Sequence, residues 1–493
     1  MARIICIGEA MKRYMSKTGK QSIGGAELNV AVALNSLGWK TTWLSVLPDN
    51  DDGMIAAISQ TGVESVIIRN DGEVGEYTVI EDEQRVQYQR DDSAFALMDP
   101  DDINIRTFMQ GHEWVHLTGI TPFLGHGPRA LWNRAMIFSE LDDIKLSLDI
   151  NHRPALCSRD ELWDVIEPHL RKVHLLSMSE QDLDWIASKE GMSGSKEEIC
   201  KEIARKWLIN RVGCTFKETQ TGRLQGWQKR WSIVATPSEV ESSRENKILH
   251  RPIEHLGSGD AWVAGVIQNE KNADLIAVIQ QSTFGDFFLS NNVDCQIAEF
   301  ETISGIVNAG IIPIIRSSSR EVAEKEARRV LDNGAQCIEF SLDTPDCIRL
   351  LGSIREKEIL KGIGTVKKPI EEILKSYKRG ARFFLSPNNP EEFIEECKMF
   401  NSLAIPGVTC IEEAEAAVAQ GAVCLKLFHS KNDWDIEELV KIRELMPEIV
   451  LIPVGGVMAE DVEKMFEIGM DAVGIGGALG SMSDVELQSL FSK

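Results

Sequence analysis

Short apolar segments alternate with longer mixed segments along most of the chain. The first, at 4–8, is entirely apolar and ends in glycine, as a strand buried in a parallel sheet does. Gly24 and Gly25 then open a segment that we expect to be helical over 30–37 and to stop at Gly38. This alternation predicts an α/β fold with a parallel sheet. Further strands are predicted at 41–47, 63–69, 115–120 and 145–150.

A more polar pattern interrupts the alternation between 76 and 90. Residues 76–81 and 85–90 have the composition of two short strands, and Asp82, Glu83 and Gln84 lie between them. This arrangement predicts a β-hairpin with its turn at 82–84. A polar hairpin that projects from an α/β domain could serve as a lid over a ligand site.

The second half of the chain carries a regular repeat. The patterning of the first half stops near 291–294, so we place a domain boundary there and expect domains at 1–294 and 295–493. Strands alternating with amphipathic helices predict a (β/α)₈ barrel of the TIM type, which places its chemistry at the C-terminal ends of the strands. The strands are predicted at 311–316, 336–340, 360–364, 383–386, 403–406, 423–428, 449–453 and 472–476.

Composition narrows the possible partners. A formal net charge of −23 argues against a surface for nucleic acid or for an anionic membrane, since both need clustered Lys and Arg. The 10 cysteines are scattered without a Cys-x-x-Cys pair, and no apolar run has the length of a membrane span or a signal peptide. We therefore expect a cytoplasmic protein whose partners are small molecules and other protein chains.

One glycine-rich turn in the first half carries candidate chemistry. Gly257, Ser258, Gly259 and Asp260 follow an extended apolar segment and lead into the apolar stretch 261–267. The free N–H groups at the start of a helix there would form an anion cradle, and Asp260 could take a proton from an acceptor hydroxyl in a phosphoryl transfer. The alternative is a simple turn in which Asp260 caps the helix.

Two arginines are expected to converge on the same cleft. Asn151 and Arg153 follow the strand that ends near Asp149, and Tyr88 and Arg90 come from the hairpin. Because a guanidinium can hold a carboxylate by two hydrogen bonds, two arginines suit an acidic substrate. A simple pairing of Asp149 with Arg153 is the alternative.

The ordered motifs of the first half resemble the ribokinase-like (PfkB) sugar kinases, and among them 2-keto-3-deoxygluconate kinase. The resemblance implies a ribokinase-like α/β sandwich with a β lid, ATP and Mg²⁺ as cofactors, and Asp260 as the catalytic base. It assigns the anion hole to Gly257, Ser258 and Gly259. It assigns substrate binding to Gly25, Asn29, Tyr88, Arg90, Asn151 and Arg153. The motifs are 24–31, 88–94, 117–122, 149–154 and 257–260.

The nucleotide side departs from that family. The family's Asp-Thr-Thr is here Glu254-His255-Leu256, and its Lys-x-Gly-x-x-Gly strand end has become 211–216. Its Asn-x-x-Glu, which helps to place magnesium and phosphate, resembles only 179–182. Sugar binding is therefore a firmer expectation than fast phosphorylation.

Three charged residues stand at predicted strand ends of the second half. Lys426 and Glu339 each interrupt an apolar strand, and Arg316 closes another. An unpaired charge inside a barrel costs several kcal/mol, so these residues should meet one another or a ligand. Desolvation lowers the pKa of a lysine and frees its amine to form a Schiff base. A buried Lys–Glu pair without chemistry is the alternative, and metal catalysis is not expected because His429 is the only histidine of the segment.

Residues 305–482 resemble the KDPG/KHG class I aldolases. The resemblance implies Lys426 as the Schiff-base lysine, Glu339 as the general acid/base, and Arg316 with Thr365 as contacts to the keto acid, without a cofactor. It assigns phosphate binding to Gly455, Gly456, Gly476 and Gly477. Two departures stand out: 429–431 replaces Pro-Ala/Gly-Glu, and Asp343 stands where many relatives carry Arg, although Lys431 could compensate.

The two kinds of enzyme that the halves resemble share an intermediate, because the product of the kinase is the substrate of the aldolase. The two resemblances favour a bifunctional Entner–Doudoroff enzyme that phosphorylates 2-keto-3-deoxygluconate and then cleaves the product to pyruvate and glyceraldehyde 3-phosphate. One alternative is an aldolase with a sugar-binding, catalytically degenerate kinase-like domain. Another is the same pair of reactions on a 2-keto-3-deoxygalactonate-type acid. The two families also imply a homo-oligomer.

Overall fold

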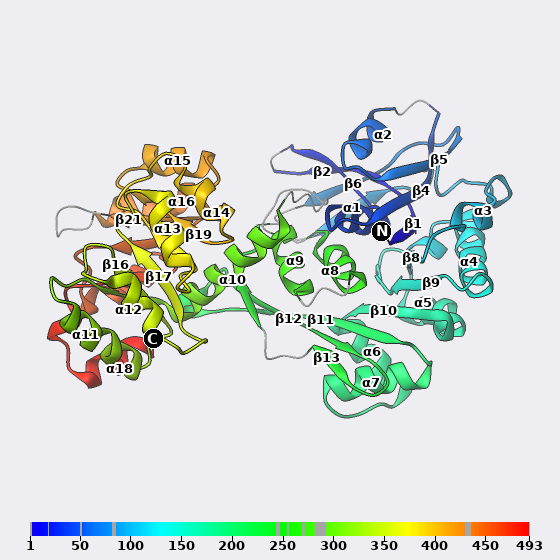
Figure 1. The fold of residues 1–493 in the computed structure, drawn as a ribbon. Coiled ribbons are helices and arrows are strands. Elements are labelled where there is room, and N and C mark those ends of the chain that lie inside the picture. The colour runs from blue at the N-terminus through cyan, green and yellow to red at the C-terminus, as the bar shows by residue number, and fades with distance from the viewer. Residues whose placement is uncertain are drawn as a thin grey trace. The chain divides into compact units, whose positions relative to one another are not determined.

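The computed structural model describes residues 2–17, 19–49, 52–80, 85–242, 247–253, 256–268, 272–281, 292–428 and 435–492. The predicted turn at 82–84, Glu254 and His255, part of the predicted boundary, and 429–431 lie outside these residues. The chain forms two compact units (Figure 1). Unit 1 comprises 1–218, 230–247 and 253–291, and unit 2 comprises 219–229, 248–252 and 292–493. Across the described ranges, no helix combines the length and hydrophobicity needed to cross a membrane.

Unit 1 is built on a mainly parallel sheet with the strand order β13-β12-β11-β10-β9-β8-β1-β4-β5. The strands predicted near the N-terminus and at 145–150 form at nearly the predicted residues, because their apolar runs are buried in this sheet. The strands are β1 (Arg3–Ile7), β4 (Lys40–Pro48), β5 (Glu64–Asn70), β8 (Trp114–Thr118), β9 (Lys145–Asp149), β10 (Val173–Ser179), β11 (Arg211–Thr219), β12 (Gln228–Ala235) and β13 (Val240–Ser242).

Helices pack on this sheet and enclose one large apolar core. The predicted helix at 30–37 begins earlier than expected, directly after Gly25. The helices are α1 (Ala26–Ser36), α2 (Asp52–Ser59), α3 (Ile105–Met109), α4 (His126–Leu141), α5 (Arg159–Ile166), α6 (Glu180–Glu190), α7 (Lys196–Lys206), α8 (Ser258–Ile267) and α9 (Ala273–Gln281).

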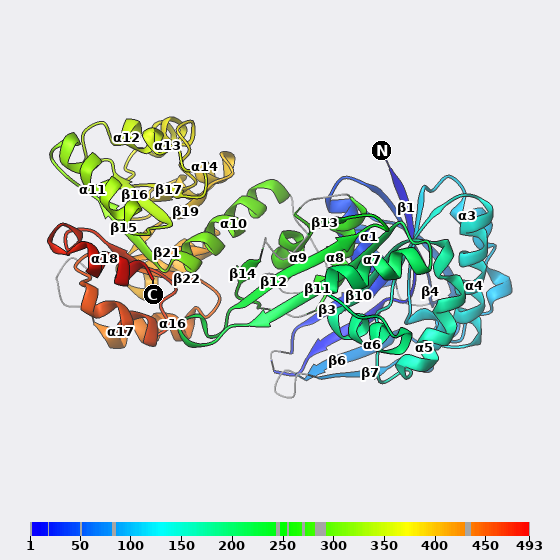
Figure 2. The same cartoon turned by 90° about the horizontal axis from the view of Figure 1, so that it is seen from below.

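A second sheet of unit 1 contains the predicted hairpin. Its order is β3-β2-β6-β7, formed by β2 (Met11–Met15), β3 (Gln21–Gly24), β6 (Gly75–Ile80) and β7 (Arg85–Gln89) (Figure 2). The pairing of β6 with β7 confirms the hairpin strands, whereas β2 and β3 were not predicted. Strand β2 buries Met11, Arg13 and Met15 on one face, and the arginine at a buried position conceals the apolar alternation.

Unit 2 is a parallel barrel whose strands follow the predicted repeat. The order of the nine described strands in its parallel sheet is β19-β18-β17-β16-β15-β23-β22-β21-β20. The strand predicted at 403–406 is observed as β19, and β20 continues it beyond the predicted end. The carbonyl of Pro406, between the two, accepts a hydrogen bond from the amide of Lys426 (2.9 Å). The sheet therefore closes on itself as a (β/α)₈ barrel. The strands are β15 (Ile311–Ile315), β16 (Cys337–Ser341), β17 (Leu360–Gly364), β18 (Phe383–Leu385), β19 (Leu403–Ile405), β20 (Gly407–Val408), β21 (Cys424–Phe428), β22 (Val450–Val454) and β23 (Val473–Ile475).

Helices surround these strands (Figure 2). Apolar side chains fill both the interior of the barrel and the layer between strands and helices. The helices are α10 (Val293–Ala309), α11 (Arg320–Asp332), α12 (Cys347–Ser353), α13 (Pro369–Tyr377), α14 (Phe393–Met399), α15 (Ile411–Ala419), α16 (Ile436–Leu445), α17 (Val462–Glu467) and α18 (Asp484–Phe491). Strand β14 (Ile248–His250) also belongs to unit 2. The boundary after residue 294 stays a prediction, since two segments that precede it pack with the barrel.

Candidate active sites

A cavity in unit 1 brings together most of the residues predicted to bind a sugar acid and a phosphoryl group. Helix α1, the lid strand β7, the segment after β9 and the start of α8 all contribute to it. Asn151, Ser258 and Gly259 are not among its described lining residues. The predicted residues that line it are Gly25, Asn29, Tyr88, Arg90, Arg153, Gly257 and Asp260.

Asp260 lies in the first turn of α8 beside Asn29. The Nδ2 of Asn29 donates a hydrogen bond to Oδ2 of Asp260 at 2.7 Å. The N-cap of α8 is Gly257, in the left-handed region with φ 75°, so Asp260 is not the cap of this helix. A carboxylate held in place at a helix N-terminus, next to free backbone amides, is suited to the role of a base near a phosphoryl group.

Two buried carboxylates of this cavity, Glu9 and Glu27, were not predicted from the sequence. Glu9 follows β1 and forms an ion pair with Arg90, whose guanidinium also lies 5.6 Å from the centre of the Tyr88 ring. Glu27 accepts hydrogen bonds from the hydroxyls of Thr118 (2.6 Å) and Thr121 (3.0 Å), and burial raises the pKa of Glu27. The position of Glu9 just after a buried parallel strand was the signal that could have identified it.

Gly25 is required by close packing. A Cβ atom built on Gly25 would lie 2.3 Å from the backbone oxygen of Glu9. No side chain fits at that distance, so Gly25 lets α1 begin against the segment after β1 that contains Glu9. The cavity wall therefore depends on this glycine.

The predicted nucleotide side contains a second carboxylate pair. Burial and the nearby charge of Asp182 raise the pKa of Asp149 to about 7, while the charge of Arg153 lowers it. Asp182 forms a capping box with Ser179 at the start of α6 and accepts a hydrogen bond from Nε of Arg159 at 3.2 Å. The counterpart of the family's Asn-x-x-Glu thus already has structural contacts here.

In unit 2, Lys426 and Glu339 are buried on two strands that lie on opposite sides of the barrel. Lys426 lies on β21 with 8% of its surface exposed, and Glu339 lies on β16 with 2% exposed. Burial lowers the pKa of Lys426, and the charge of Glu339 opposes this shift. Burial raises the pKa of Glu339, against the charges of Lys426 and Arg316. An amine whose pKa is lowered by burial and a carboxyl whose pKa is raised by burial form a pair suited to imine chemistry.

Arg316 and Thr365 lie at the same end of the strands. Arg316, directly after β15, forms an ion pair with Asp343, which Lys367 also contacts at 3.4 Å. Asp343 is therefore neutralised by two cations. Thr365 has φ 66°, and its hydroxyl lies 2.9 Å from that of Ser341. The carboxylate of Asp343 and the hydroxyl groups of Ser341 and Thr365 thus line the strand ends near the buried Lys426 and Glu339.

Glycines border this end of the barrel at β22 and β23. Gly455 and Gly456 follow β22 with φ 99° and 70°, values that favour glycine. Gly476 and Gly477 follow β23, which pairs with β22, and a Cβ on Gly477 would meet no atom within 4 Å. Open glycine backbone at these two strands suits a phosphate.

Both halves of the chain match known protein families. Residues 1–212 match the family described as pfkB family carbohydrate kinase, and residues 303–491 match KDPG and KHG aldolase. Among solved structures, a 2-dehydro-3-deoxygluconokinase from Thermotoga maritima has a TM-score of 0.54 at 23% identity, covering 61% of this chain and 98% of that one. This likeness shows a ribokinase-like fold for the first unit.

Curated relatives are similar to each half separately. The 2-dehydro-3-deoxy-6-phosphogalactonate aldolase of Escherichia coli is 27% identical over 34% of this chain and 83% of its own length. The 2-dehydro-3-deoxygalactonokinase of Haloferax volcanii is 27% identical over 54% of this chain and 83% of its own. The 2-dehydro-3-deoxygluconokinase of Bacillus subtilis is 26% identical over 53% and 81%. The chain thus joins an N-terminal PfkB kinase domain to a C-terminal KDPG/KHG aldolase domain.

The packing of Gly364 against Glu339 gives a first prediction. A Cβ on Gly364 would lie 1.6 Å from Oε1 of Glu339, so Gly364→Ala must displace this carboxyl. We expect a loss of roughly 1–3 kcal/mol in local stability, the usual cost of overpacking. Hydrogen-exchange mass spectrometry should detect it as faster exchange in β16 and β17. Gly480→Ala, whose Cβ would lie 3.8 Å from its nearest neighbour, is the control. Wild-type protection in Gly364→Ala would contradict the packing argument.

The charges around Lys426 give a second prediction. Its amine should react with a small acylating reagent along a pH curve whose midpoint lies below the ordinary 10.5 of lysine. Glu339→Gln removes a charge that favours the ammonium form, so the midpoint should move to lower pH. Arg316→Met removes a charge that disfavours it, so the midpoint should move to higher pH. Peptide mass spectrometry measures both curves, and shifts in the same direction would refute this electrostatic account.

Proposed function

We propose that this chain is a bifunctional enzyme that phosphorylates a 2-keto-3-deoxy sugar acid and then cleaves the phosphorylated product by a Schiff-base aldol reaction. The observation that carries the proposal is the presence, on one chain, of two sites whose chemistries share an intermediate. One site has Asp260 beside a helix N-terminus in a cavity with Arg90 and Arg153. The other has Lys426 buried near Glu339.

In the kinase step, Arg90 and Arg153 hold the carboxylate of the sugar acid, and Asp260 accepts the proton of the attacking hydroxyl. Asn29 orients Asp260 through its hydrogen bond. ATP is the expected phosphoryl donor, and Mg²⁺ would neutralise the charge of its phosphates when bound. The open space around Gly259, where a Cβ would meet no atom within 4 Å, is compatible with a phosphate at the amides of Gly257, Ser258 and Gly259.

Arg90 already has a counter-ion in the cavity. Its ion pair with Glu9 keeps the buried guanidinium neutralised when no substrate is bound. A substrate carboxylate must compete with Glu9 or bind on the remaining donors, since Nε of Arg90 is buried without a hydrogen bond among the described residues.

In the cleavage step, the neutral amine of Lys426 attacks the C2 keto group and water leaves, which forms an iminium ion. The iminium accepts the electron pair of the C3–C4 bond as it breaks, while the C4 hydroxyl loses its proton and becomes the aldehyde. Glu339 relays the protons, and hydrolysis of the imine releases pyruvate. Arg316 and Thr365 are placed to hold the keto acid, and Gly455, Gly456, Gly476 and Gly477 to hold the phosphate.

Two alternatives have specific support. The contacts of Asp182 with Ser179 and Arg159 favour a degenerate kinase domain that binds the sugar acid without turnover. Relatives with galactonate names accompany those with gluconate names, which favours the galactonate epimer as a second candidate substrate. The epimers differ at one hydroxyl, so direct comparison of the two acids is required.

A coupled assay tests the whole proposal. The wild-type protein is given ATP, Mg²⁺ and either 2-keto-3-deoxygluconate or 2-keto-3-deoxygalactonate. It should produce both ADP and pyruvate, and the acid with the higher kcat/KM is the preferred substrate. Asp260→Asn should lose ADP formation yet cleave supplied phosphorylated substrate, and Lys426→Ala should form ADP without pyruvate. Cleavage of phosphorylated substrate by a wild-type protein that forms no ADP from either acid would favour the degenerate-kinase alternative.

Trapping of the imine tests the aldolase half alone. Borohydride added with pyruvate should reduce the imine and leave a stable adduct on the peptide that contains Lys426, because the desolvated amine is the nucleophile. Lys426→Ala should show neither adduct nor cleavage. An adduct on a different lysine, or cleavage that survives the mutation and is lost to chelators, would exclude this mechanism.

A further inference from the structure

The barrel unit contains two segments from the first half of the sequence. Thr219–Lys229 forms the connection between β11 and β12, and Ile248–Pro252 includes β14. Both segments precede α10 by tens of residues, yet they pack with unit 2. Their side chains show what they contribute to it.

Trp227 and Leu249 belong to the apolar cluster that fills the interior of the barrel. Both are 2% exposed and share this cluster with Ile312 and Phe383 of the strands and with Ile306 of α10. The amide of Leu249 also donates a hydrogen bond to the hydroxyl of Ser304 on α10 (3.0 Å). These contacts close the end of the barrel interior at which the parallel strands begin, because Trp227 contacts Asp471, which lies just before β23. The site of the buried lysine is at the opposite end of the strands.

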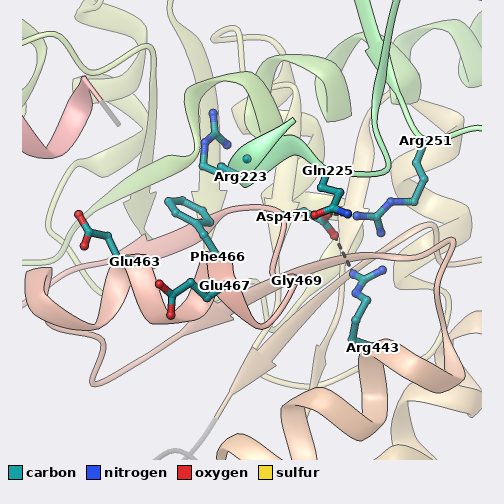
Figure 3. Close-up of a pocket in the computed structure, with 10 residues that line it drawn as sticks. Arg223, Gln225, Arg251, Arg443, Glu463, Phe466, Glu467, Gly469 and Asp471 are labelled. Atoms are coloured by element: carbon teal, nitrogen blue, oxygen red, sulfur yellow. Dashed lines mark hydrogen bonds and ion pairs between the residues drawn. The ribbon is translucent and has the colours of Figure 1, made fainter. Parts of the chain in front are cut away.

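A single buried carboxylate holds these segments. Asp471, 2% exposed, accepts hydrogen bonds from Nε1 of Trp227 (3.1 Å) and from the amide of Leu451 (2.9 Å). It also forms ion pairs with Arg251 (2.7 Å) and Arg443 (2.8 Å), both of which point toward it in Figure 3. Loss of one partner would leave a buried charge uncompensated, which is strongly destabilising.

The same residues line a cavity of about 770 Å³, which raises the alternative of an anion site. The hydrogen bonds argue against it. Arg223 donates to the carbonyls of Val307 (2.8 Å) and Asn308 (3.1 Å), and Arg251 donates to that of Pro447 (2.8 Å). Arg443 donates to the carbonyls of Pro447 (2.9 Å) and Ile449 (2.8 Å), and Glu463 and Glu467 line the cavity as well. The arginines therefore bind this chain rather than a ligand.

We propose that this end of the barrel is a docking surface for Thr219–Lys229 and Ile248–Pro252, and that their docking on Asp471 keeps the barrel interior closed. The aldolase unit is then assembled from three stretches of sequence, and the stretch after residue 294 is incomplete alone. Trp227, Arg251 and Asp471 are positioning residues, which act on the barrel through its packing. This inference does not depend on the proposed reactions.

Two thiols inside the barrel report on its closure. Cys337 and Cys424 belong to the same interior cluster as Trp227. Burial raises the pKa of Cys337 to about 12 and that of Cys424 well above its ordinary value, so both resist alkylation while the interior is closed. Cys6 and Cys200, buried in unit 1, provide an internal reference.

The test uses the full chain, native conditions and iodoacetamide, with labelling read by peptide mass spectrometry. Trp227→Ala and Arg251→Met should raise the labelling rates of Cys337 and Cys424 roughly tenfold or more, while Cys6 and Cys200 stay protected. Arg328→Met, which removes an exposed ion pair with Glu356 (2.7 Å) elsewhere on the barrel, is the matched control and should label as wild type. Asp471→Asn should show the largest increase in labelling rate. If the Asp471→Asn protein does not fold, the labelling rates of Trp227→Ala test the proposal.

Two outcomes would overturn the proposal. The first is labelling of Cys337 and Cys424 at the wild-type rate in both Trp227→Ala and Arg251→Met. The second is protection of Arg251 and Arg443 from phenylglyoxal by inorganic phosphate. This result would show that the two arginines bind an anion and do not hold the docked segments. Since neither readout uses substrate, failure here is distinguishable from failure of the proposed reactions.

Discussion

An ionised side chain can stay in an apolar interior only if other charges or hydrogen bonds compensate its lost hydration. Both units meet this constraint where their chemistry is expected. In the barrel, Lys426 and Glu339 each shift the other's pKa toward the charged form against burial. In the kinase domain, Arg90 is neutralised by Glu9, while two threonine hydroxyls stabilise Glu27. Nearby charges and hydrogen bonds therefore offset part of the burial cost of these groups before any ligand binds.

The overall architecture could be predicted from the sequence, because buried parallel strands are short and almost wholly apolar. The barrel strands formed at or within a few residues of the predicted positions for this reason, and Lys426 and Glu339 stood out against that background. Strand β2 was missed because Arg13 occupies a buried position in it. Local periodicity detects an element only when its buried positions are apolar.

The contacts within the candidate sites were harder to predict from the sequence than the fold. Motif resemblance identified Asp260, Asn29, Arg90 and Arg153, which do line one cavity, but it gave no indication of Glu9 as the partner of Arg90. It also could not show that Trp227 packs with the later domain. The hydrogen bond from Trp227 to Asp471 joins residues 244 positions apart, and nothing in the local sequence of either residue specifies such a contact.

The close approach of Gly364 to Glu339 has an evolutionary consequence. Because any side chain at 364 would occupy the volume of the carboxyl group, the two positions cannot vary independently. A lineage that shortened the acid at 339 would gain freedom at 364, and a later return to glutamate would then cost local stability until glycine was restored. Transplanting this acid onto another barrel likewise means transplanting a glycine on the adjacent strand. The carboxyl group at 339 and the missing side chain at 364 thus form one structural unit, which must be kept or changed together.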